Sequence, residues 1–309
     1  MTFGAVRAAV FQAYQEKRYQ NALDLVAQAI SHFPEHEVRL TNWQAVLYEA
    51  LGQPEEALVV MTRFVSAGGW YGERMLMDDD FQATRALPGF SDLLAACRER
   101  QAAAVAAVRP ELQVRCNVPA GAGAPTLVVL HGNHGDMNQS EPAWAPAADL
   151  GCVVGLAQST QIEAPGMYVW DDWAKGENEV VGHLSQIAAH PAADAKRMVL
   201  CGFSMGAGLA AYLALKGSAS VRGFVVLGPY LPDMDQVKAT LAGARERGVR
   251  GYIMCGDHDR ISLEHAQHLH DFMRENGLPV GLDVIAGLGH EYPPDFRERL
   301  ERALAFVLA

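Results

Sequence analysis

The sequence predicts a two-part chain, with a helical-repeat-like region over residues 1–110 and an α/β region over residues 111–309. Apolar residues recur with helical spacing in the first region, whereas short apolar runs alternate with amphipathic stretches in the second. Strands that alternate with helices indicate a mostly parallel sheet with helices on both faces. Because 50% of the 309 residues are hydrophobic, the chain can bury a sizeable core.

The first region carries an amphipathic helical stripe that occurs twice. Tyr19–Pro34 resembles the second half of a tetratricopeptide repeat, and Leu51–Leu58 resembles the turn and second helix of the next repeat, at the usual period of about 34 residues. Val6–Tyr14 and Leu40–Ala50 are the predicted partner helices. The match is partial, because Ser66–Trp70 stands where a closing proline is expected. The stripe residues are Ala22, Leu25, Val26, Ala29 and Ile30, then Ala57, Val60, Met61, Phe64 and Val65.

About two such repeats are too few to stand alone, since a stack needs roughly three to bury its faces. We therefore expect residues 1–110 to dock on the α/β region and to shape one wall of its cleft. The alternative is a binding module for a peptide, a partner subunit or a second copy of the chain. Asp78–Asp80 are predicted to cap a helix start, because no further ligands are spaced to help them bind a metal. The predicted helix Ser91–Val108 ends this region.

Charge and cysteine content argue against several classes of function. The net charge is −11 and no Lys/Arg block occurs, which disfavours nucleic acid and anionic membrane surfaces as partners. No apolar stretch approaches the length of a membrane span, and the first residues lack a signal-peptide pattern. The odd number of widely spaced cysteines indicates reduced thiols in a cytoplasmic protein, without zinc-site spacing, so no metal is expected. They are Cys97, Cys116, Cys152, Cys201 and Cys255.

In the α/β region, motifs that directly follow a strand are the best candidates for a functional site, because sites in such sheets lie at the carboxyl ends of the strands. The predicted strands are Leu112–Val118, Thr126–His131, Cys152–Ala157, Arg197–Cys201, Gly223–Leu227, Gly251–Cys255 and Val280–Ile285. The predicted helices are Glu177–His190, Met205–Lys216, Met234–Glu246, Ser262–Asn276 and a last one from Pro294 to the end.

The motif Gly-Phe-Ser-Met-Gly at residues 202–206 stands between a predicted strand and a predicted helix. A G-x-S-x-G match indicates a nucleophilic serine only in that context, because the sharp turn between strand and helix holds the serine in a strained conformation at the top of the sheet. Gly202 and Gly206 are small where the strand and helix backbones crowd together. The motif indicates that Ser204 is a nucleophile for acyl transfer.

The loop at residues 131–136 follows another predicted strand and reads His-Gly-Asn-His-Gly-Asp. Small residues there let a backbone N–H turn toward the serine. We expect the N–H groups of Asn133 and Met205 to form an oxyanion hole. We expect His131 to brace the loop through hydrogen bonds, since the catalytic donors of such loops are backbone groups.

The acid and the base of a serine nucleophile of this kind follow it in the order Ser, Asp/Glu, His. His290, in a glycine loop after a predicted strand, is the candidate base. Asp257 and Asp259 both follow another strand and compete as the acid that orients it, and Asp233 is a third candidate one strand earlier.

With these motifs, residues 112–309 resemble the α/β-hydrolase superfamily, and within it the phospholipase/carboxylesterase and dienelactone-hydrolase-like enzymes. Their acid loop reads G-x-x-D followed by an apolar residue two positions on. Here that pattern is met by Gly256, Asp259 and Ile261, so the resemblance implies Asp259 as the acid. It also implies an α/β-hydrolase fold and a carboxylesterase-like serine hydrolase. The helical-repeat-like region lies outside the usual pattern of the family.

The segment Gln158–Lys175 joins a predicted strand to the next helix without inserting a long lid. Tyr168, Trp170 and Trp173 are the candidate substrate-binding residues, although they could equally pack this segment onto the body. A compact hydrolase without a cap fits a small or medium-sized ester, with no cofactor. Peptidase and thioesterase activities use the same machinery and stay open, as does a non-catalytic interaction protein.

Overall fold

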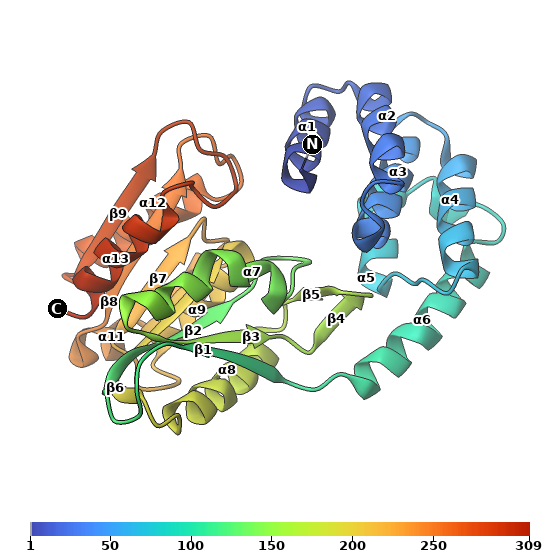
Figure 1. Cartoon of the computed structure of the whole chain (residues 1–309). Helices are drawn as coiled ribbons and strands as arrows, with labels where there is room; N and C mark the ends of the chain where they lie inside the picture. The colour runs from blue at the N-terminus through green and yellow to red at the C-terminus, as the bar shows by residue number, and fades with distance from the viewer. Residues whose placement is uncertain (1) are drawn as a thin grey trace. The chain divides into compact units, whose positions relative to one another are not determined.

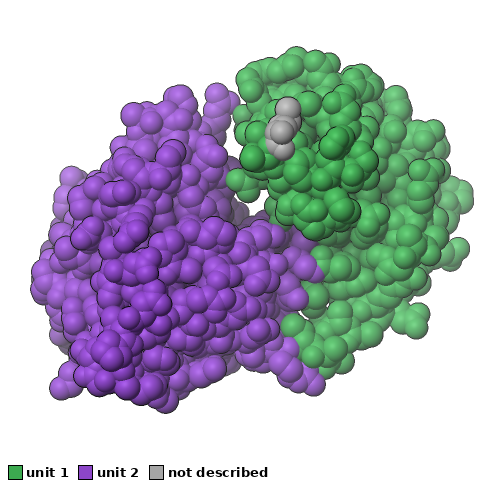
Figure 2. All heavy atoms as spheres, viewed as in Figure 1, with its two compact units in different colours: residues 1–108, 162–165 green, residues 109–161, 166–309 purple. Residues whose placement is uncertain are grey.

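The computed structural model describes residues 2–309, apart from the side chains of residues 241 and 242. Contacts between residues divide the chain into two compact units (Figures 1 and 2). The helical unit runs up to Val108 and includes Ile162–Pro165, which come from much later in the sequence. The sheet unit consists of Arg109–Gln161 and Gly166–Ala309.

The helical unit is all-α, as predicted, apart from the late segment that joins it. The faces of α2 and α4 that carry the repeated stripe lie in its interior, with Ala22, Val26, Ala57 and Met61 fully buried. Pro54 begins α4 at a position where its missing N–H costs no hydrogen bond. The helices are α1 (Phe3–Gln15), α2 (Tyr19–Ile30), α3 (Glu37–Ala50), α4 (Pro54–Ser66), α5 (Glu73–Leu76) and α6 (Phe90–Ala107). Short 3₁₀ turns are η1 (Pro34–His36), η2 (Asp79–Phe81) and η3 (Thr84–Ala86).

Within the described residues, the main sheet of the sheet unit has seven strands in the order β1-β3-β2-β6-β7-β8-β9. Strand β1 runs antiparallel to β3 at one edge, and the other neighbours are parallel. The mostly parallel sheet predicted from the sequence is therefore confirmed. The strands are β1 (Glu111–Cys116), β2 (Ala124–Leu130), β3 (Val153–Gln158), β6 (Ala193–Phe203), β7 (Gly223–Leu227), β8 (Arg250–Gly256) and β9 (Val280–Ile285).

Helices cover both faces of this sheet (Figure 1). Successive residues of β2 point to opposite faces, so Leu127 and Val129 enter one core and Val128 and Leu130 the other. The core around Val128 includes side chains of α8, α9 and α12, and the core around Leu127 includes side chains of α7 and α13. The helices are α7 (Met137–Trp144), α8 (Trp173–Ala188), α9 (Ser204–Lys216), α10 (Met234–Lys238), α11 (Leu241–Arg247), α12 (Leu263–Glu275) and α13 (Phe296–Val307), with a 3₁₀ segment η4 (Ala145–Leu150).

The main departures from the predicted elements lie within residues 111–309. The single helix expected over Met234–Glu246 is two helices, α10 and α11, separated by a turn at residues 239–240. Helix α7 was not predicted. The excursion Gln158–Lys175 contains a hairpin of two short strands, β4 (Gln161–Ala164) and β5 (Met167–Val169), where the sequence suggested a plain connection.

The five cysteines are free thiols, and four of them are buried. Asp78 accepts a hydrogen bond from the Asp80 N–H at the start of η2, which is the capping role expected for this acidic run. None of the helices formed by the described residues combines the length and the hydropathy needed to cross a bilayer.

Candidate active site

Ser204 stands at the junction of β6 and α9, where the backbone turns sharply. Its φ of 55° lies in the left-handed region, which costs a residue other than glycine about 1–3 kcal/mol. The neighbouring glycines explain how the turn closes. A Cβ on Gly202 would lie 2.7 Å from the Gly206 backbone, and one on Gly206 would lie 2.3 Å from the His131 carbonyl oxygen. The strained serine predicted from the motif is therefore present.

The imidazole of His290 links Ser204 to an acid. Its Nε2 lies 2.8 Å from the Ser204 Oγ, and its Nδ1 lies 2.7 Å from the Asp259 Oδ2. The other carboxylate oxygen of Asp259 accepts hydrogen bonds from the N–H groups of Ile261 (3.1 Å) and Ser262 (3.0 Å). Asp259 follows β8 and His290 follows β9, so three strand ends of one sheet bring the three side chains together.

Asp259 is only 2% exposed. Burial by itself would raise the pKa of this carboxyl, but the hydrogen bond and charge of His290 and the N–H groups of Ser262 and Ile261 outweigh burial and leave the pKa lowered. The carboxylate is therefore ionised near neutral pH. An ionised acceptor places the ring proton on Nδ1 of His290, which leaves Nε2 free to accept the Ser204 proton.

The two competing aspartates are engaged elsewhere. The Asp257 carboxylate accepts a hydrogen bond of 2.7 Å from the Gly287 N–H and ties the acid loop to the histidine loop. The Asp233 carboxylate accepts from the N–H groups of Asp235 and Gln236 and caps α10. These contacts favour Asp259 among the three aspartates that the sequence left in competition.

Aromatic rings hold the imidazole in place, and sequence reasoning did not identify them. The ring of Phe203 lies 4.7 Å from that of His290, and the ring of Tyr292 lies 4.9 Å from that of Phe203. The Tyr292 hydroxyl accepts a hydrogen bond of 3.0 Å from the indole of the buried Trp144. Phe203 fills the first of the two variable positions of the serine motif, and Tyr292 follows His290 by two residues, so both lie beside predicted site residues.

The loop at residues 131–136 lies against the turn at Ser204. A Cβ on Gly132 would be 3.5 Å from the Ser204 Cβ. The His131 ring is 1% exposed, contacts the Gly132 oxygen through Nδ1 (2.9 Å) and accepts from the Ser159 N–H through Nε2 (3.3 Å). Burial lowers the pKa of His131 to about 4, so this ring is neutral and braces the loop. Asn133 is exposed beside it, and the Met205 N–H lies in the first turn of α9, where a helix leaves N–H groups unpaired.

The three candidate substrate-binding aromatics lie in different surroundings. Tyr168 is half-buried, and its N–H donates to the Gly135 oxygen at 3.1 Å. Trp170 is 0% exposed and belongs to the core, so we withdraw it as a substrate contact. The Trp173 ring contacts that of Tyr212 in a tilted arrangement (4.5 Å between ring centres), and both residues line a surface pocket. Tyr212 stands eight residues beyond Ser204 on α9, about 12 Å along the helix axis.

Two family models match this sequence. Residues 4–105 match the model described as the A/B hydrolase-like, N-terminal domain, and residues 156–303 match the dienelactone hydrolase family. The protein is an esterase-like α/β-hydrolase. The resemblance to hydrolases of this type, read from the motifs, is thus confirmed. The helical region of the hydrolase has a family model of its own, so its likeness to tetratricopeptide repeats stays an interpretation of the repeated stripe.

Solved structures resemble the hydrolase over different lengths. An uncharacterized protein from Bacillus cereus is 26% identical with a TM-score of 0.57 and covers 99% of both chains. Acyl-protein thioesterase 2 from Zea mays is 20% identical with a TM-score of 0.53, covering 64% of this chain and 99% of its own. A Bacillus cereus carboxylesterase is 18% identical with a TM-score of 0.50, and the match covers 65% of this chain and 96% of the carboxylesterase. The last two show the α/β-hydrolase fold. No curated protein is similar enough in sequence to count as a match.

Proposed function

We propose that the hydrolase cleaves small or medium-sized carboxylic esters through a Ser204–His290–Asp259 triad and an acyl-enzyme. The observation that carries this proposal is the pair of hydrogen bonds made by one imidazole, 2.8 Å to the Ser204 Oγ and 2.7 Å to Asp259. An unassisted serine hydroxyl is a weak nucleophile because it stays protonated near neutral pH. A neighbouring base that accepts its proton makes the oxygen a stronger nucleophile.

In the first half of the proposed reaction, the Ser204 Oγ attacks the ester carbonyl carbon while its proton passes to His290 Nε2. The carbonyl π electrons move to oxygen and form a tetrahedral oxyanion. The carbon–oxygen bond to the alcohol then breaks, and His290 donates its proton to the departing oxygen. In the second half, His290 takes a proton from water, the resulting hydroxide attacks the acyl-enzyme, and the acid product leaves as Ser204 regains its proton. The Asp259 carboxylate stabilises the imidazolium in both halves.

We propose that the backbone N–H groups of Asn133 and Met205 bind the oxyanion. The Met205 N–H belongs to the first turn of α9, where the helix dipole also favours negative charge. Such donors act where charge develops, and removal of one costs roughly 2.7–4 kcal/mol in a well-measured case. His131 and its hydrogen bonds support the loop that carries Asn133.

The substrate class follows from the surroundings of the serine. No Lys or Arg is part of the Ser204–His290–Asp259 hydrogen-bond chain or of the residue 131–136 loop, so a strongly anionic leaving group has no partner in them. We propose Tyr168, whose N–H bonds to the residue 131–136 loop, as a contact for the ester group, and Trp173 as a contact for a longer substituent. The free cysteines support the expected cytoplasmic location.

The test compares turnover of p-nitrophenyl esters of increasing acyl length by wild type and Ser204→Ala, with an acyl thioester and a p-nitroanilide amide as parallel substrates. We expect ester turnover by wild type that falls by at least about 10⁴-fold in Ser204→Ala. Equal turnover by the two proteins would remove the proposal. A clear preference for the thioester or the amide would keep the triad but change the substrate class.

A further inference from the structure

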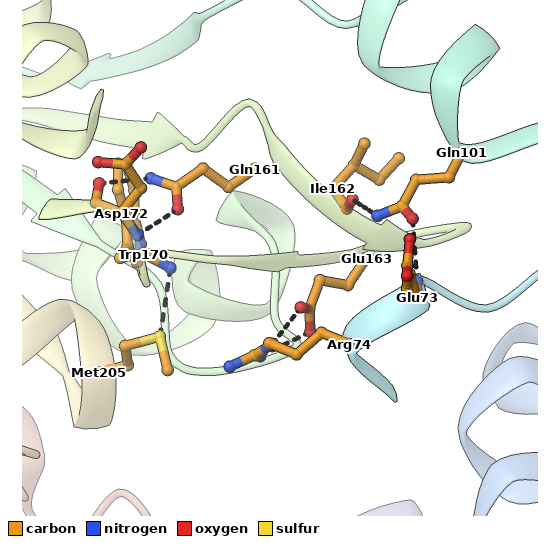
Figure 3. Close-up of polar contacts among 9 residues, drawn as sticks. All are labelled: Glu73, Arg74, Gln101, Gln161, Ile162, Glu163, Trp170, Asp172 and Met205. Atoms are coloured by element: carbon orange, nitrogen blue, oxygen red, sulfur yellow. Dashed lines mark hydrogen bonds and ion pairs between the residues drawn. The ribbon is translucent and has the colours of Figure 1, made fainter. Parts of the chain in front are cut away.

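The β4–β5 hairpin and the residue just beyond it contact the loop that carries Asn133 and the side chain of Met205. The Tyr168 N–H in β5 donates to the Gly135 oxygen in the loop that carries Asn133 (3.1 Å). Just beyond β5, the Trp170 N–H donates to the thioether sulfur of Met205 (3.2 Å). The two ends of the hairpin are tied together, because the Gln161 side chain makes two hydrogen bonds to the Asp172 backbone, of 3.0 and 2.8 Å (Figure 3).

The tip of the same hairpin is part of the helical unit. Arg74 in α5 donates two hydrogen bonds to the Glu163 carboxylate, from Nε to Oε1 and from Nη2 to Oε2 at 2.7 Å (Figure 3). We call this two-donor ion pair the clamp. The Gly72 N–H donates to the Glu163 carbonyl at 2.5 Å. Gly72 allows this approach, since a Cβ there would lie 2.7 Å from that oxygen. The Gln101 amide adds a bond of 3.4 Å to the Ile162 carbonyl.

The charge of Glu163 makes this clamp strong. The Glu163 side chain is 8% exposed, whereas that of Arg74 is 54% exposed. A carboxylate taken out of water needs its partner, because an unpaired buried charge is costly. The two-donor geometry also fixes the orientation of Glu163, which a single-point contact would not do. The hairpin is short, with four residues in β4 and three in β5, so a shift of its tip reaches its base.

We propose that Arg74 and Glu163 are positioning residues for the oxyanion hole, acting through the β4–β5 hairpin. Through its clamp on the tip, the helical unit holds β5 in the place where Tyr168 and Trp170 fix Gly135 and Met205. The expected effect on kcat rests on the proposed function, whereas the expected effect on the position of β5 does not. This positioning role gives the helical unit a task in catalysis that requires no partner protein.

The kinetic test is Glu163→Gln, which keeps the shape of the side chain and removes its charge. The matched control is Glu73→Gln, because Glu73 also pairs with an arginine through two contacts, with Arg98, but on the exposed surface of the helical unit. A misplaced oxyanion hole lowers kcat, so we expect about a tenfold fall in kcat for Glu163→Gln with KM changed less than about twofold. Glu73→Gln should match wild type. The charge-reversed pair Arg74→Glu with Glu163→Arg should recover part of the loss.

The second test needs no turnover and therefore separates this inference from the proposed function. Amide hydrogen exchange reports the Tyr168 and Trp170 N–H groups directly, with amides of α13 as a reference for global unfolding. We expect exchange at these two amides to accelerate by at least about tenfold in Glu163→Gln, with no change in α13 and none in Glu73→Gln. If the Tyr168 and Trp170 amides exchange in Glu163→Gln at the same rate as in wild type, the inference is overturned, regardless of the measured ester turnover. An equal acceleration in α13 would also overturn it, by showing a general loss of stability.

Discussion

Replacing Asp259 by asparagine should disable the relay while changing little of its shape. In the native site, Oδ1 accepts from two backbone N–H groups at 3.0 and 3.1 Å, and Oδ2 accepts from His290 at 2.7 Å. The amide oxygen of asparagine must take the Oδ1 position, because an NH₂ group there would face two donors. The NH₂ group then faces His290 Nδ1 as a donor. The imidazole must carry its proton on Nε2, where it can no longer accept from Ser204.

The size of the loss follows from that change of tautomer. A wrong tautomer of this kind costs about 10⁴-fold in kcat, which is about 5.4 kcal/mol at 1.36 kcal/mol per factor of ten. The assay is kcat on the best p-nitrophenyl ester at neutral pH. Asp257→Asn is the control, since an amide oxygen can still accept from the Gly287 N–H, and its kcat should stay within about twofold of wild type. Activity of Asp259→Asn within a factor of ten of wild type would refute the reasoning, and so would an equal loss in Asp257→Asn.

Two further predictions concern stability. Because the pKa of Asp259 is lowered in the folded protein, its contribution to stability is present above the unfolded pKa and is lost as the pH falls through the folded one. The urea unfolding free energy of wild type should therefore drop more than that of Asp259→Asn between about pH 5 and about pH 3, and parallel curves would contradict this. Gly206→Ala should destabilise the fold by about 3 kcal/mol, because its Cβ would lie 2.3 Å from a backbone oxygen. Gly182→Ala, with open space in α8, should instead stabilise by about 0.5–1 kcal/mol, and similar effects of the two changes would count against the packing argument.

The sequence predicted the main sheet well because its strands are short apolar runs bounded by glycine, proline and charged residues. Strands β7 and β9 have the predicted bounds, and the other strands differ from prediction by a few residues at their ends. The hairpin was missed for a physical reason. Its strands are short, β4 has two polar residues of four, and the tip pairs with Arg74, which lies far away in the sequence. Pro165-Gly166 was a turn signal that could have revealed it.

The candidate site was predictable where chain order and strand ends carry the information. Ser204 and His290 follow from their motifs, but spacing alone left Asp257 and Asp259 in competition, and only the pattern of related hydrolases favoured one. Contacts made across the fold were out of reach. Nothing in the local sequence shows that the ring of Phe203 contacts that of His290, or that Trp170 is fully buried and so cannot contact a substrate.

The most direct test of the account is the site of covalent labelling by an organophosphonate probe, which is attacked by an activated serine and mimics the tetrahedral intermediate. Mass spectrometry of the digested protein should place one phosphonyl group on Ser204 in wild type. Labelling should be lost in Ser204→Ala and be slower by several orders of magnitude in His290→Ala, because the relay that accepts the Ser204 proton is gone. Label on another residue, or equal labelling rates in wild type and His290→Ala, would contradict the account.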